Sequence, residues 1–309
     1  MTDVVLKTEL GSGTFGTIFE VLYKGAPKAG KIYELSDDKS IDFETLRELS
    51  ICQELKNTHP NMAKMEEIIV YKKTFMMIME KYTCDLHTLI RKASFTDEDK
   101  INISFKLLHV VDFLHNHNII HRDIKTNNVL MKKVNGIYEP YLGDFGAAKY
   151  FNTHENEKAP THTDKVSTRT YRAPEIVNKK KYRLICDEWS LGIVLYEVIT
   201  NKLITIDKDS KLMRFIGIYI ELFAKNHPTY SKLISGLLTS PPSKRLTCKK
   251  ALKLPLFQDK IVPDISSYPR ILYWISKRKL EKLKKSATGS SDEEGESSDE
   301  EEESSDWKF

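Results

Sequence analysis

The segment LGSGTFGTI, residues 10–18, is a glycine-rich turn of the G-x-G-x-x-G type. Dinucleotide-binding folds share this spacing, but there the turn opens a helix, and linkers also contain such glycines. Here the run Thr17–Val21 is β-branched and aromatic, so it predicts a second strand. Two strands joined by a glycine turn form a flap, and the amides of Gly11, Gly13 and Gly16 can approach phosphate oxygens that a side chain would block. The segment therefore favours phosphate binding.

Lys31 follows Gly16 by fifteen residues, in AGKIY, at a predicted third-strand position that faces the flap. A lysine in a strand is commonly an edge charge exposed to solvent. A buried lysine requires a carboxylate partner, and Glu48 lies on a helix that we predict from Phe43 to Leu55. Lys31 and Glu48 are therefore candidates for a buried ion pair.

The segment HRDIKTNN, residues 121–128, places a carboxylate, an ammonium and an amide within six positions, at Asp123, Lys125 and Asn128. It directly follows the apolar residues Ile119 and Ile120. Asp and Asn commonly serve in turns and helix caps, so this segment can be read as a charged surface loop. The alternative is that it holds the parts of an active site.

The first third of the chain must position the flap and Lys31. Runs of β-type residues with glycine punctuation predict strands at Val4–Leu10, Thr17–Tyr23 and Phe75–Met79. Within the predicted helix, apolar residues recur every three positions, at Leu46, Leu49, Cys52 and Leu55. These patterns predict one helix laid on a small sheet.

After about Asp85 the pattern becomes helical. Apolar residues at helical spacing predict an amphipathic helix through residues 101–114. The segment WSLGIVLYEVI, residues 189–199, is apolar almost all round, which predicts a helix buried at the centre of this part. The sequence thus predicts an α+β protein whose second part is mainly helical.

The motifs follow one another in a fixed order: GSGTFG, AGK, an RE helix, HRDIKTNN, GDFG, RAPE and DEWSLG. In this ordered set the chain resembles the eukaryotic-type protein kinases, over residues 4 to about 258. The resemblance implies an α+β, bilobal protein kinase fold, with a small antiparallel β-sheet and one main helix in the N-lobe and a larger, mainly helical C-lobe. The lobes would comprise residues 1–84 and 85–260.

The resemblance also implies phosphoryl transfer, in which catalysis consists of positioning and charge neutralisation. Asp123 would orient the attacking hydroxyl and accept its proton, and Lys125 would neutralise charge on the moving γ-phosphate. Lys31, held by Glu48, would contact the α- and β-phosphates of ATP.

The implied metal is Mg²⁺, with Asn128 and Asp144 of GDFG as its hard-oxygen ligands. At the hinge, Glu80 and Tyr82 would present their backbone to adenine, and Asp85 would reach the ribose. The residues expected to bind the nucleotide are Leu10, Gly11, Ser12, Gly13, Thr14, Phe15, Gly16, Thr17, Ile18, Lys31, Glu80, Tyr82 and Asp85.

Other motif residues are expected to support the fold. By resemblance, Glu175 of RAPE pairs with Arg245 in SPPSKRLT, and Asp187 anchors the backbone of the catalytic loop. His121 and Phe145 would pack in the core rather than take part in the chemistry.

Lys125, two residues after Asp123, and Thr168, ahead of YRAPE, form the pattern of serine/threonine kinases. The resemblance therefore implies protein substrates that carry Ser or Thr hydroxyls, and a place for Thr168 among the catalytic residues.

The segments LRELSICQEL and VSTRTYRAPE resemble the cyclin-dependent and mitogen-activated group of kinases. In that group three basic residues collect a phosphothreonine of the activation loop, and Arg47, Arg122 and Lys149 occupy the matching positions. Thr163 would then carry the regulatory phosphate, and an activating kinase or a regulatory subunit would be a partner. The alternative is that Thr163 is an ordinary loop threonine.

Some features depart from this group. About fifty residues separate WSLG from SKRLT, too few for the large insert of the group, and Thr170 replaces its usual Trp, which argues against proline-directed specificity. Asn127 stands where arginine-preferring kinases carry Glu. The compact core and LGDFGAAKY are similar to serine/threonine kinases of large DNA viruses, including herpesviruses.

The composition, 40% apolar and 30% charged residues over 309 positions, predicts a mostly globular chain. No apolar run approaches the ~18 residues of a membrane span, and the start at Met1–Asp3 does not suit a secretory signal. We therefore expect an intracellular protein, cytoplasmic or nuclear, with no membrane partner. The four cysteines lie far apart without CxxC spacing and are expected to be plain buried thiols.

The C-terminal end divides into two segments. Residues 261–285 form a basic extension that contains SKRKLEKLKK, a solvated helix or a patch for nuclear import or anionic surfaces. Residues 286–309 hold ten Asp or Glu against one Lys and have low complexity, so they are expected to be a disordered acidic tail.

Two other classes of function compete with an active kinase. A pseudokinase-like binding module usually lacks the strand lysine, the loop aspartate or the metal aspartate, and this sequence keeps all three. A nucleic-acid-binding protein is suggested only by the basic body of the chain, and its binding would weaken with salt and need no ATP. The sequence favours the active kinase and makes nucleic acid an unfavoured partner.

Overall fold

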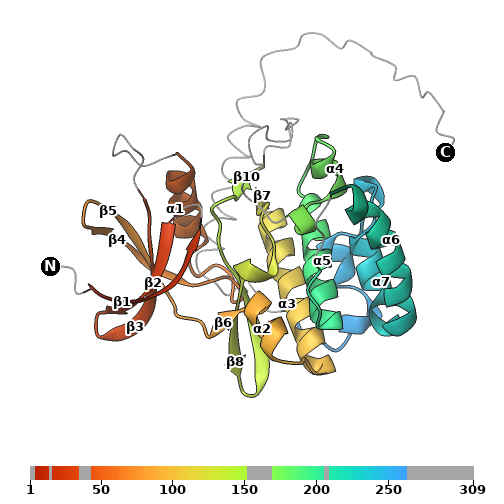
Figure 1. Cartoon of the computed structure of the whole chain (residues 1–309), viewed down its shortest axis with the longest axis horizontal. Coiled ribbons are helices and arrows are strands. Elements are labelled where there is room, and N and C mark those ends of the chain that lie inside the picture. The colour runs from red at the N-terminus through yellow and green to blue at the C-terminus, as the bar shows by residue number, and fades with distance from the viewer. Residues whose placement is uncertain (1–3, 14–15, 35–42, 152–168, 205–208, 263–309) are drawn as a thin grey trace, which may run out of the picture. The chain divides into compact units, whose positions relative to one another are not determined.

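A computed structural model describes residues 4–13, 16–34, 43–151, 169–204 and 209–262 (Figure 1). These residues fall within one structural unit, Met1–Asp264. In these ranges no helix is both long enough and apolar enough to cross a membrane.

Five antiparallel strands form the N-terminal sheet, in the order β1-β2-β3-β5-β4. Their bounds are Val4–Gly13 for β1, Gly16–Tyr23 for β2, Ala26–Ile32 for β3, Met65–Tyr71 for β4 and Thr74–Met79 for β5. Tight turns at Lys24–Gly25 and Lys72–Lys73 join neighbouring strands, and all four turn residues have positive φ, as two-residue hairpin turns require. The three strands expected from the sequence are confirmed.

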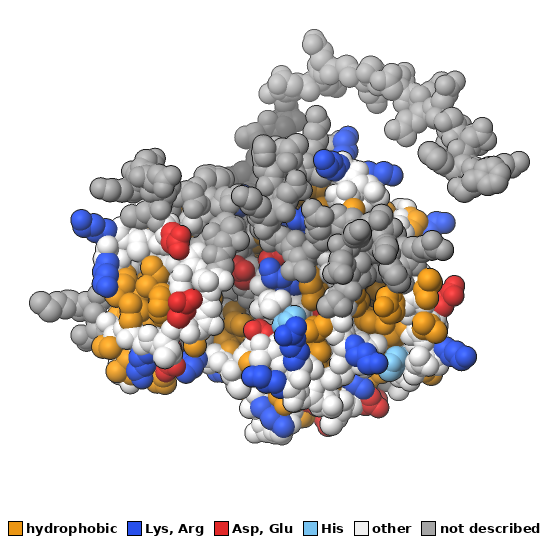
Figure 2. Space-filling view, viewed as in Figure 1, with side chains coloured by type: hydrophobic (Ala, Val, Ile, Leu, Met, Phe, Trp, Pro, Cys, Tyr) orange, Lys and Arg blue, Asp and Glu red, His pale blue; other side chains and the backbone are white. Residues whose placement is uncertain are grey.

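The two faces of this sheet differ, because successive side chains of a strand point to opposite sides. One face carries the apolar cluster of Val21, Tyr23, Ile69, Met76 and Ile78. Further apolar side chains are exposed over these strands, at the left of Figure 2. The other face carries the side chains of the alternate residues of β3. One of them is Lys31, which pairs with Glu48 of α1 (Phe43–Leu55).

The helix α1 has the predicted bounds, but its buried stripe differs from the expected one. Leu49, Cys52 and Leu55 are buried, whereas Leu46 is 48% exposed. A three-residue repeat drifts around a helix that has 3.6 residues per turn, so Leu46 lies off the face that Leu55 occupies. Glu48, at 1% exposed, lies on the buried face instead.

The C-terminal part is mainly helical and is built around α5 (Cys186–Thr200), whose side chains are buried on nearly all sides, as predicted. It contacts α3 (Asp97–Asn116) and α7 (Pro228–Leu237). Gly192 permits the close approach of α7, because a Cβ there would lie 2.8 Å from a methyl group of Leu238. The other helices are α2 (Leu86–Lys92), α4 (Pro174–Val177), α6 (Asp209–Asn226) and α8 (Cys248–Ala251).

Short strands in this part position the polar loops. The hairpin of β8 (Val129–Val134) and β9 (Ile137–Leu142) pairs with β6 (Cys84–Asp85). Separately, β7 (Ile119–Ile120) pairs with β10 (Lys149–Tyr150). The segment 121–128 therefore leaves β7, passes through a 3-10 turn at Thr126–Asn128 and enters β8. The predicted α+β class, with one main helix on the sheet and a mainly helical second part, is confirmed.

Candidate active site

Lys31 and Glu48 form the buried ion pair that the sequence suggested. Lys31 Nζ lies 2.7 Å from Glu48 Oε1, and the two side chains are 9% and 1% exposed. Lys31 Nζ also lies 3.7 Å from Asp144 Oδ1. Burial opposes the positive charge, but Glu48 and Asp144 outweigh it and raise the pKa of Lys31, so the lysine stays an ammonium.

The flap forms beside β3 as predicted, with Gly11 opposite Ile18 and Gly13 opposite Gly16 across β1 and β2. Gly16 has a φ of 138°, and a Cβ there would lie 2.1 Å from the Ile32 carbonyl oxygen. Only glycine allows the start of β2, next to the tip of the flap, to lie this close to the end of β3. Thr14 and Phe15, at the tip, lie outside the described residues.

The other predicted flap residues form its two strands. The side chain of Leu10 is 49% exposed. Gly11 and Ser12 are exposed, whereas Thr17 and Ile18 are half-buried. The flap thus offers backbone rather than charged side chains.

The loop 121–128 converges on the carboxylate of Asp123. Lys125 Nζ lies 2.7 Å from Asp123 Oδ2, and Asn128 Nδ2 donates to the same oxygen at 2.9 Å and to the Asp123 carbonyl at 2.8 Å. The other oxygen, Oδ1, is buried and has no hydrogen-bond partner in the described part of the chain. Burial raises the pKa of Asp123, Lys125 opposes this rise, and Asp144 adds to it. A carboxylate with one unpartnered oxygen can accept a proton or bind a cation.

Asp144 lies between the loop and the ion pair. Its φ is 56°, an uncommon value for a non-glycine residue, and its side chain is 40% exposed. The preceding Gly143 donates its amide hydrogen to the Asn128 carbonyl at 2.9 Å, so the two segments are joined directly. Asp144 lines a small cavity together with Glu48, Met77, Met79 and Phe145.

The oxygens of Asn128, Asp144 and Asp123 fit a hard cation such as Mg²⁺. The Asn128 amide nitrogen is used in bonds to Asp123, which leaves its oxygen for another partner. Mg²⁺ usually takes only one or two protein carboxylates and completes its shell with water and phosphate oxygens. The described residues contain no group of three or more His, Cys, Asp or Glu side chains able to enclose a metal, and a site of that kind is not what Mg²⁺ requires.

The hinge residues lie between β5 and β6. The Glu80 amide donates to the Lys64 carbonyl at 2.9 Å, and its carboxylate pairs with Lys132. The Tyr82 hydroxyl accepts the Lys64 amide hydrogen at 3.0 Å. The Asp85 carboxylate accepts the Thr88 amide hydrogen at 2.6 Å and so caps α2, a structural role that the sequence analysis did not include.

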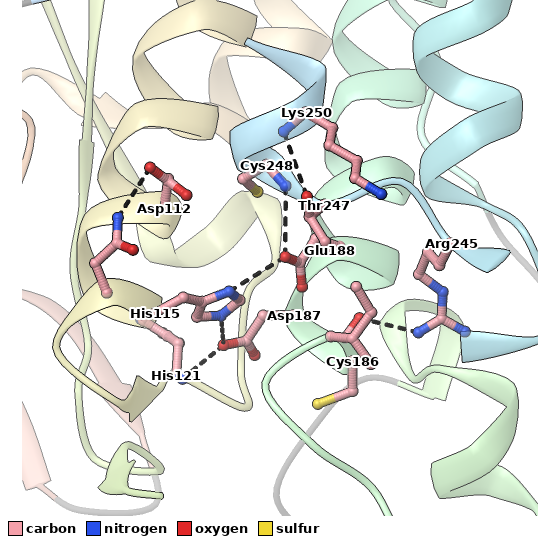
Figure 3. Close-up of polar contacts among 12 residues, drawn as sticks. Asp112, His115, His121, Cys186, Asp187, Glu188, Arg245, Thr247, Cys248 and Lys250 are labelled. Carbon is pink, nitrogen blue, oxygen red and sulfur yellow. Dashed lines mark hydrogen bonds and ion pairs between the residues drawn. The ribbon is translucent and has the colours of Figure 1, made fainter. Parts of the chain in front are cut away.

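Asp187 anchors the loop, as the sequence suggested. One of its oxygens accepts the amide hydrogen of His121 at 2.8 Å (Figure 3), and the other accepts that of Arg122 at 2.9 Å. His115 lies between Asp187 and Glu188 in Figure 3, at 3.0 and 3.2 Å from their carboxylates. Burial opposes protonation, yet these two acids raise the pKa of His115 to about 10, so His115 is an imidazolium at neutral pH.

Glu175 and Arg245 form the second predicted pair. Arg245 donates from Nη1 and Nη2 to the two Glu175 oxygens at 2.7 and 2.9 Å, and both side chains are buried. The guanidinium also donates to the carbonyls of Thr239, Ser240 and Ile185. This fork joins α4 to the segment after α7, so its role is to support the fold.

Three of the four predicted regulatory residues, Arg47, Arg122 and Lys149, lie in the described part of the chain. Arg122 Nη1 lies 3.4 Å from the Tyr182 hydroxyl, and Lys149 Nζ lies 6.0 Å from the centre of the Tyr182 ring, so these two cations meet at one tyrosine. Arg47 is half-buried on α1. Thr163 and Thr168 lie outside the described residues.

Some site residues were missed by the sequence analysis. One of them is His115, whose charge neutralises the two buried acids Asp187 and Glu188. A second group joins the loop to α5: the Thr126 and Tyr171 hydroxyls lie 2.9 Å apart, and the Tyr171 hydroxyl donates to Glu197 at 2.8 Å. Tyr33 is a third, and its spacing of two from Lys31 on a strand was the available signal.

The model of the protein kinase domain family matches residues 4–257. The chain belongs to the protein kinase family. Mitogen-activated protein kinase 15 of Xenopus laevis is 29% identical to this kinase over 292 residues, which cover 81% of this chain and 49% of the relative. The kinase thus spans about half the length of that curated relative.

Membership of the family accounts for the fold. The sheet with its helix and the mainly helical second part are the protein kinase fold, and members of this family transfer phosphoryl groups to proteins. Enzymes of this family take the phosphoryl group from ATP, typically with Mg²⁺.

Proposed function

We propose that this kinase is an active ATP- and Mg²⁺-dependent serine/threonine protein kinase. The observation that supports this proposal most directly is the convergence of two polar groups: Lys31, Glu48 and Asp144 on one side, and Asp123 with its partners on the other. The Gly143–Asn128 hydrogen bond of 2.9 Å links the two groups. A convergence of this kind suits transfer between a bound nucleotide and an incoming hydroxyl.

Each charged group then has a task in the reaction. Lys31, oriented by Glu48, binds the α- and β-phosphates, and the flap amides cover the nucleotide. Asn128 and Asp144 hold Mg²⁺, which when bound neutralises charge on the phosphates. Asp123 accepts the proton of the substrate hydroxyl, and Lys125 neutralises charge on the transferred group.

The hinge is proposed to bind adenine through the Glu80 carbonyl and the Tyr82 amide, because no hydrogen bond within the described ranges uses either group. Asp85 reaches the ribose with the carboxylate oxygen that does not cap α2. The cavity lined by Met79 lies beside this position.

The decisive test compares the wild-type kinase with Asp123→Asn in an assay with labelled ATP, Mg²⁺ and mixed protein substrates. We expect Asp123→Asn to lower kcat by at least about a hundredfold while ATP still binds, because the lost group acts only in the transfer step. The matched control is Asp97→Asn, an exposed α3 carboxylate that pairs with Lys100. Equal labelling by wild type and Asp123→Asn would refute the proposal. ATP binding without transfer by the wild type would indicate a binding module instead.

Specificity for Ser and Thr rests on Lys125 beside Asp123 and on Thr168. Phosphoamino-acid analysis of labelled substrates should find phosphoserine and phosphothreonine and no phosphotyrosine. Thr168→Ala should lower kcat/KM for a serine peptide, whereas Thr168→Ser should retain most of it. Phosphotyrosine as the main product would overturn this assignment.

We further propose that the kinase belongs near the cyclin-dependent and mitogen-activated group, and that phosphorylation of Thr163 activates it. The 29% identity to a mitogen-activated kinase and the meeting of Arg122 and Lys149 at Tyr182 support this placement. A phosphate can order a loop by pairing with such cations, to which Arg47 would contribute. Mass spectrometry of active enzyme should find phosphate on Thr163, and unchanged activity of Thr163→Ala would exclude this control.

We propose that the partner of this kinase is an activating kinase or a regulatory subunit. Its location is proposed to be cytoplasmic or nuclear. If the similarity to kinases of large DNA viruses reflects a viral origin, that location is in the host cell. Fractionation of cells that express the full chain, with the acidic tail at 286–309 intact, tests the location.

A further inference from the structure

Tyr33 directly follows β3 and lies two positions beyond Lys31. Side chains two apart on an extended strand point to the same face, so Tyr33 projects toward α1 as Lys31 does. The backbone is fixed, because the Tyr33 amide donates to the Phe75 carbonyl at 3.1 Å and its own carbonyl accepts from the Thr74 hydroxyl at 2.6 Å. The side chain is 1% exposed. A tyrosine held this firmly cannot turn to solvent.

The ring of Tyr33 lies beside the ion pair. Lys31 Nζ is 5.0 Å from the ring centroid, within the range of a cation–π contact. Burial and the neighbouring Glu48 carboxylate raise the pKa of Tyr33. The phenol therefore keeps its proton at neutral pH and can only be a donor toward a carboxylate.

Glu48 has room for such a donor. Its Oε1 accepts from Lys31 at 2.7 Å, whereas Oε2 is buried and has no hydrogen-bond partner in the described ranges. A buried carboxylate oxygen without a donor is costly. The Tyr33 hydroxyl contacts Met77 Sδ at 3.9 Å, and a thioether is a weak acceptor, so the hydroxyl gives up little by turning to Glu48.

We propose that Tyr33 is a positioning residue for phosphate binding: its hydroxyl donates to Glu48 Oε2, and its ring supports the Lys31 ammonium. One ion-pair bond leaves the carboxylate free to rotate, and a second bond to its other oxygen fixes its plane. The lysine is then held toward the nucleotide phosphates. This inference rests on the proposed function, because it takes from it the contact between Lys31 and ATP.

The first test is Tyr33→Phe, which keeps the ring and removes only the hydroxyl. We expect KM for ATP to rise about five- to tenfold and kcat to fall as well, because Lys31 contacts the α-phosphate and also the β-phosphate, which leaves with ADP and takes up negative charge. The matched control is Tyr23→Phe, a buried tyrosine on the opposite face of the sheet whose hydroxyl donates to Glu67 at 2.5 Å. Tyr23→Phe should leave KM unchanged.

A second readout separates positioning from packing. Burial raises the pKa of Glu48 and the Asp144 carboxylate adds to the rise, whereas the Lys31 ammonium and the nearby Tyr33 hydroxyl oppose it. Removing the hydroxyl takes away one bond to the charged form, so the pKa of Glu48 rises further. The acid limb of binding of a fluorescent ATP analogue should therefore move to higher pH in Tyr33→Phe, and the melting temperature without nucleotide serves as the measure of packing.

A double-mutant cycle with Glu48→Gln completes the test. If Tyr33 acts through Glu48, Tyr33→Phe should weaken nucleotide binding in the wild-type background and have no further effect in Glu48→Gln. Equal effects in both backgrounds, or a Tyr33→Phe enzyme with wild-type affinity and pH profile, would overturn the inference. Asp123→Asn is assayed alongside these variants. If Asp123→Asn transfers phosphate as well as the wild type, the proposed function is wrong. If only the Tyr33 inference is wrong, Asp123→Asn is still inactive.

Discussion

His115 Nε2 lies 3.0 Å from Asp187 Oδ2, and this carboxylate accepts the amide hydrogens of His121 and Arg122, the two residues that begin the loop 121–128. Arg122, one of these two, has a φ of 66°. A non-glycine residue in this region is strained, so the loop needs an outside contact to hold it. The imidazolium keeps Asp187 charged and oriented, because buried carboxylates without a cation would take up protons.

His115→Gln should therefore destabilise the kinase by about 3–5 kcal/mol at pH 7, because it leaves Asp187 and Glu188 buried without their cation. The folded-state pKa of His115, about 10, is above the unfolded value of 6.5, so its stabilisation is complete below pH 6.5 and is lost as the pH rises toward 10. Denaturant unfolding should show the difference between wild type and variant shrinking over that range. His227→Gln, at a half-buried histidine whose pKa is lowered, is the control, and a difference that stays constant with pH would contradict this account.

Gly16→Ala should destabilise the kinase without nucleotide by about 1–3 kcal/mol, because it forces a strained φ and moves the start of β2 away from the end of β3. Gly11→Ala is the matched control in the same flap, since a Cβ there meets nothing within 4 Å. Thermal unfolding of the two variants should separate them. Equal melting temperatures would mean that the flap does not lie as close to the Ile32 carbonyl as the structure places it.

Glu197→Gln should change how stability depends on pH. Burial raises the pKa of Glu197 to about 7, while the bonds from Tyr171 and the Ile204 amide oppose the rise. The folded state therefore binds a proton that the unfolded state releases near pH 4.5, and the wild type loses stability, on the order of 3 kcal/mol, as the pH rises from 4.5 through 7. The variant lacks this loss, so its stability relative to wild type should increase with pH. Parallel stability curves would refute the assignment.

Arg245→Met should cost about 3–5 kcal/mol, because it leaves Glu175 buried and unpaired. Arg245→Lys keeps the charge but loses the fork, so it should fall between wild type and Arg245→Met. The double variant Arg245→Met with Glu175→Gln should recover part of the stability. Urea unfolding measures all three, and at temperatures where Arg245→Met is folded its KM for ATP should match the wild type.

Sequence reasoning anticipated those contacts whose partners belong to ordered motifs. Lys31 with Glu48, Glu175 with Arg245, and Asp187 with the loop backbone were all expected, and the structure contains each of them. These residues could be paired because each motif keeps a fixed place along a chain of this family. His115 belongs to no such motif, and the spacing of Tyr33 from Lys31 indicated only a shared face of the strand and no partner.

The burial of two residues, Leu46 and Cys84, differs from what the sequence pattern predicted. The three-residue apolar repeat placed Leu46 on the buried face of α1, and it is 48% exposed. The cysteines were expected to be buried, and Cys84 is only half-buried because it lies at the edge of the hinge on β6. Neither property follows from residue type alone.

The sequence by itself determined the class of fold and the identity of the polar groups, because glycine turns, apolar periodicity and motif order are local properties of the chain. The tertiary structure alone decided which oxygen of Glu48 is left without a donor, and that His115 carries a charge between two acids. Burial, electrostatic neighbours and hydrogen-bond geometry arise only when segments distant in sequence pack together, and these three quantities set the charge and the orientation of a side chain.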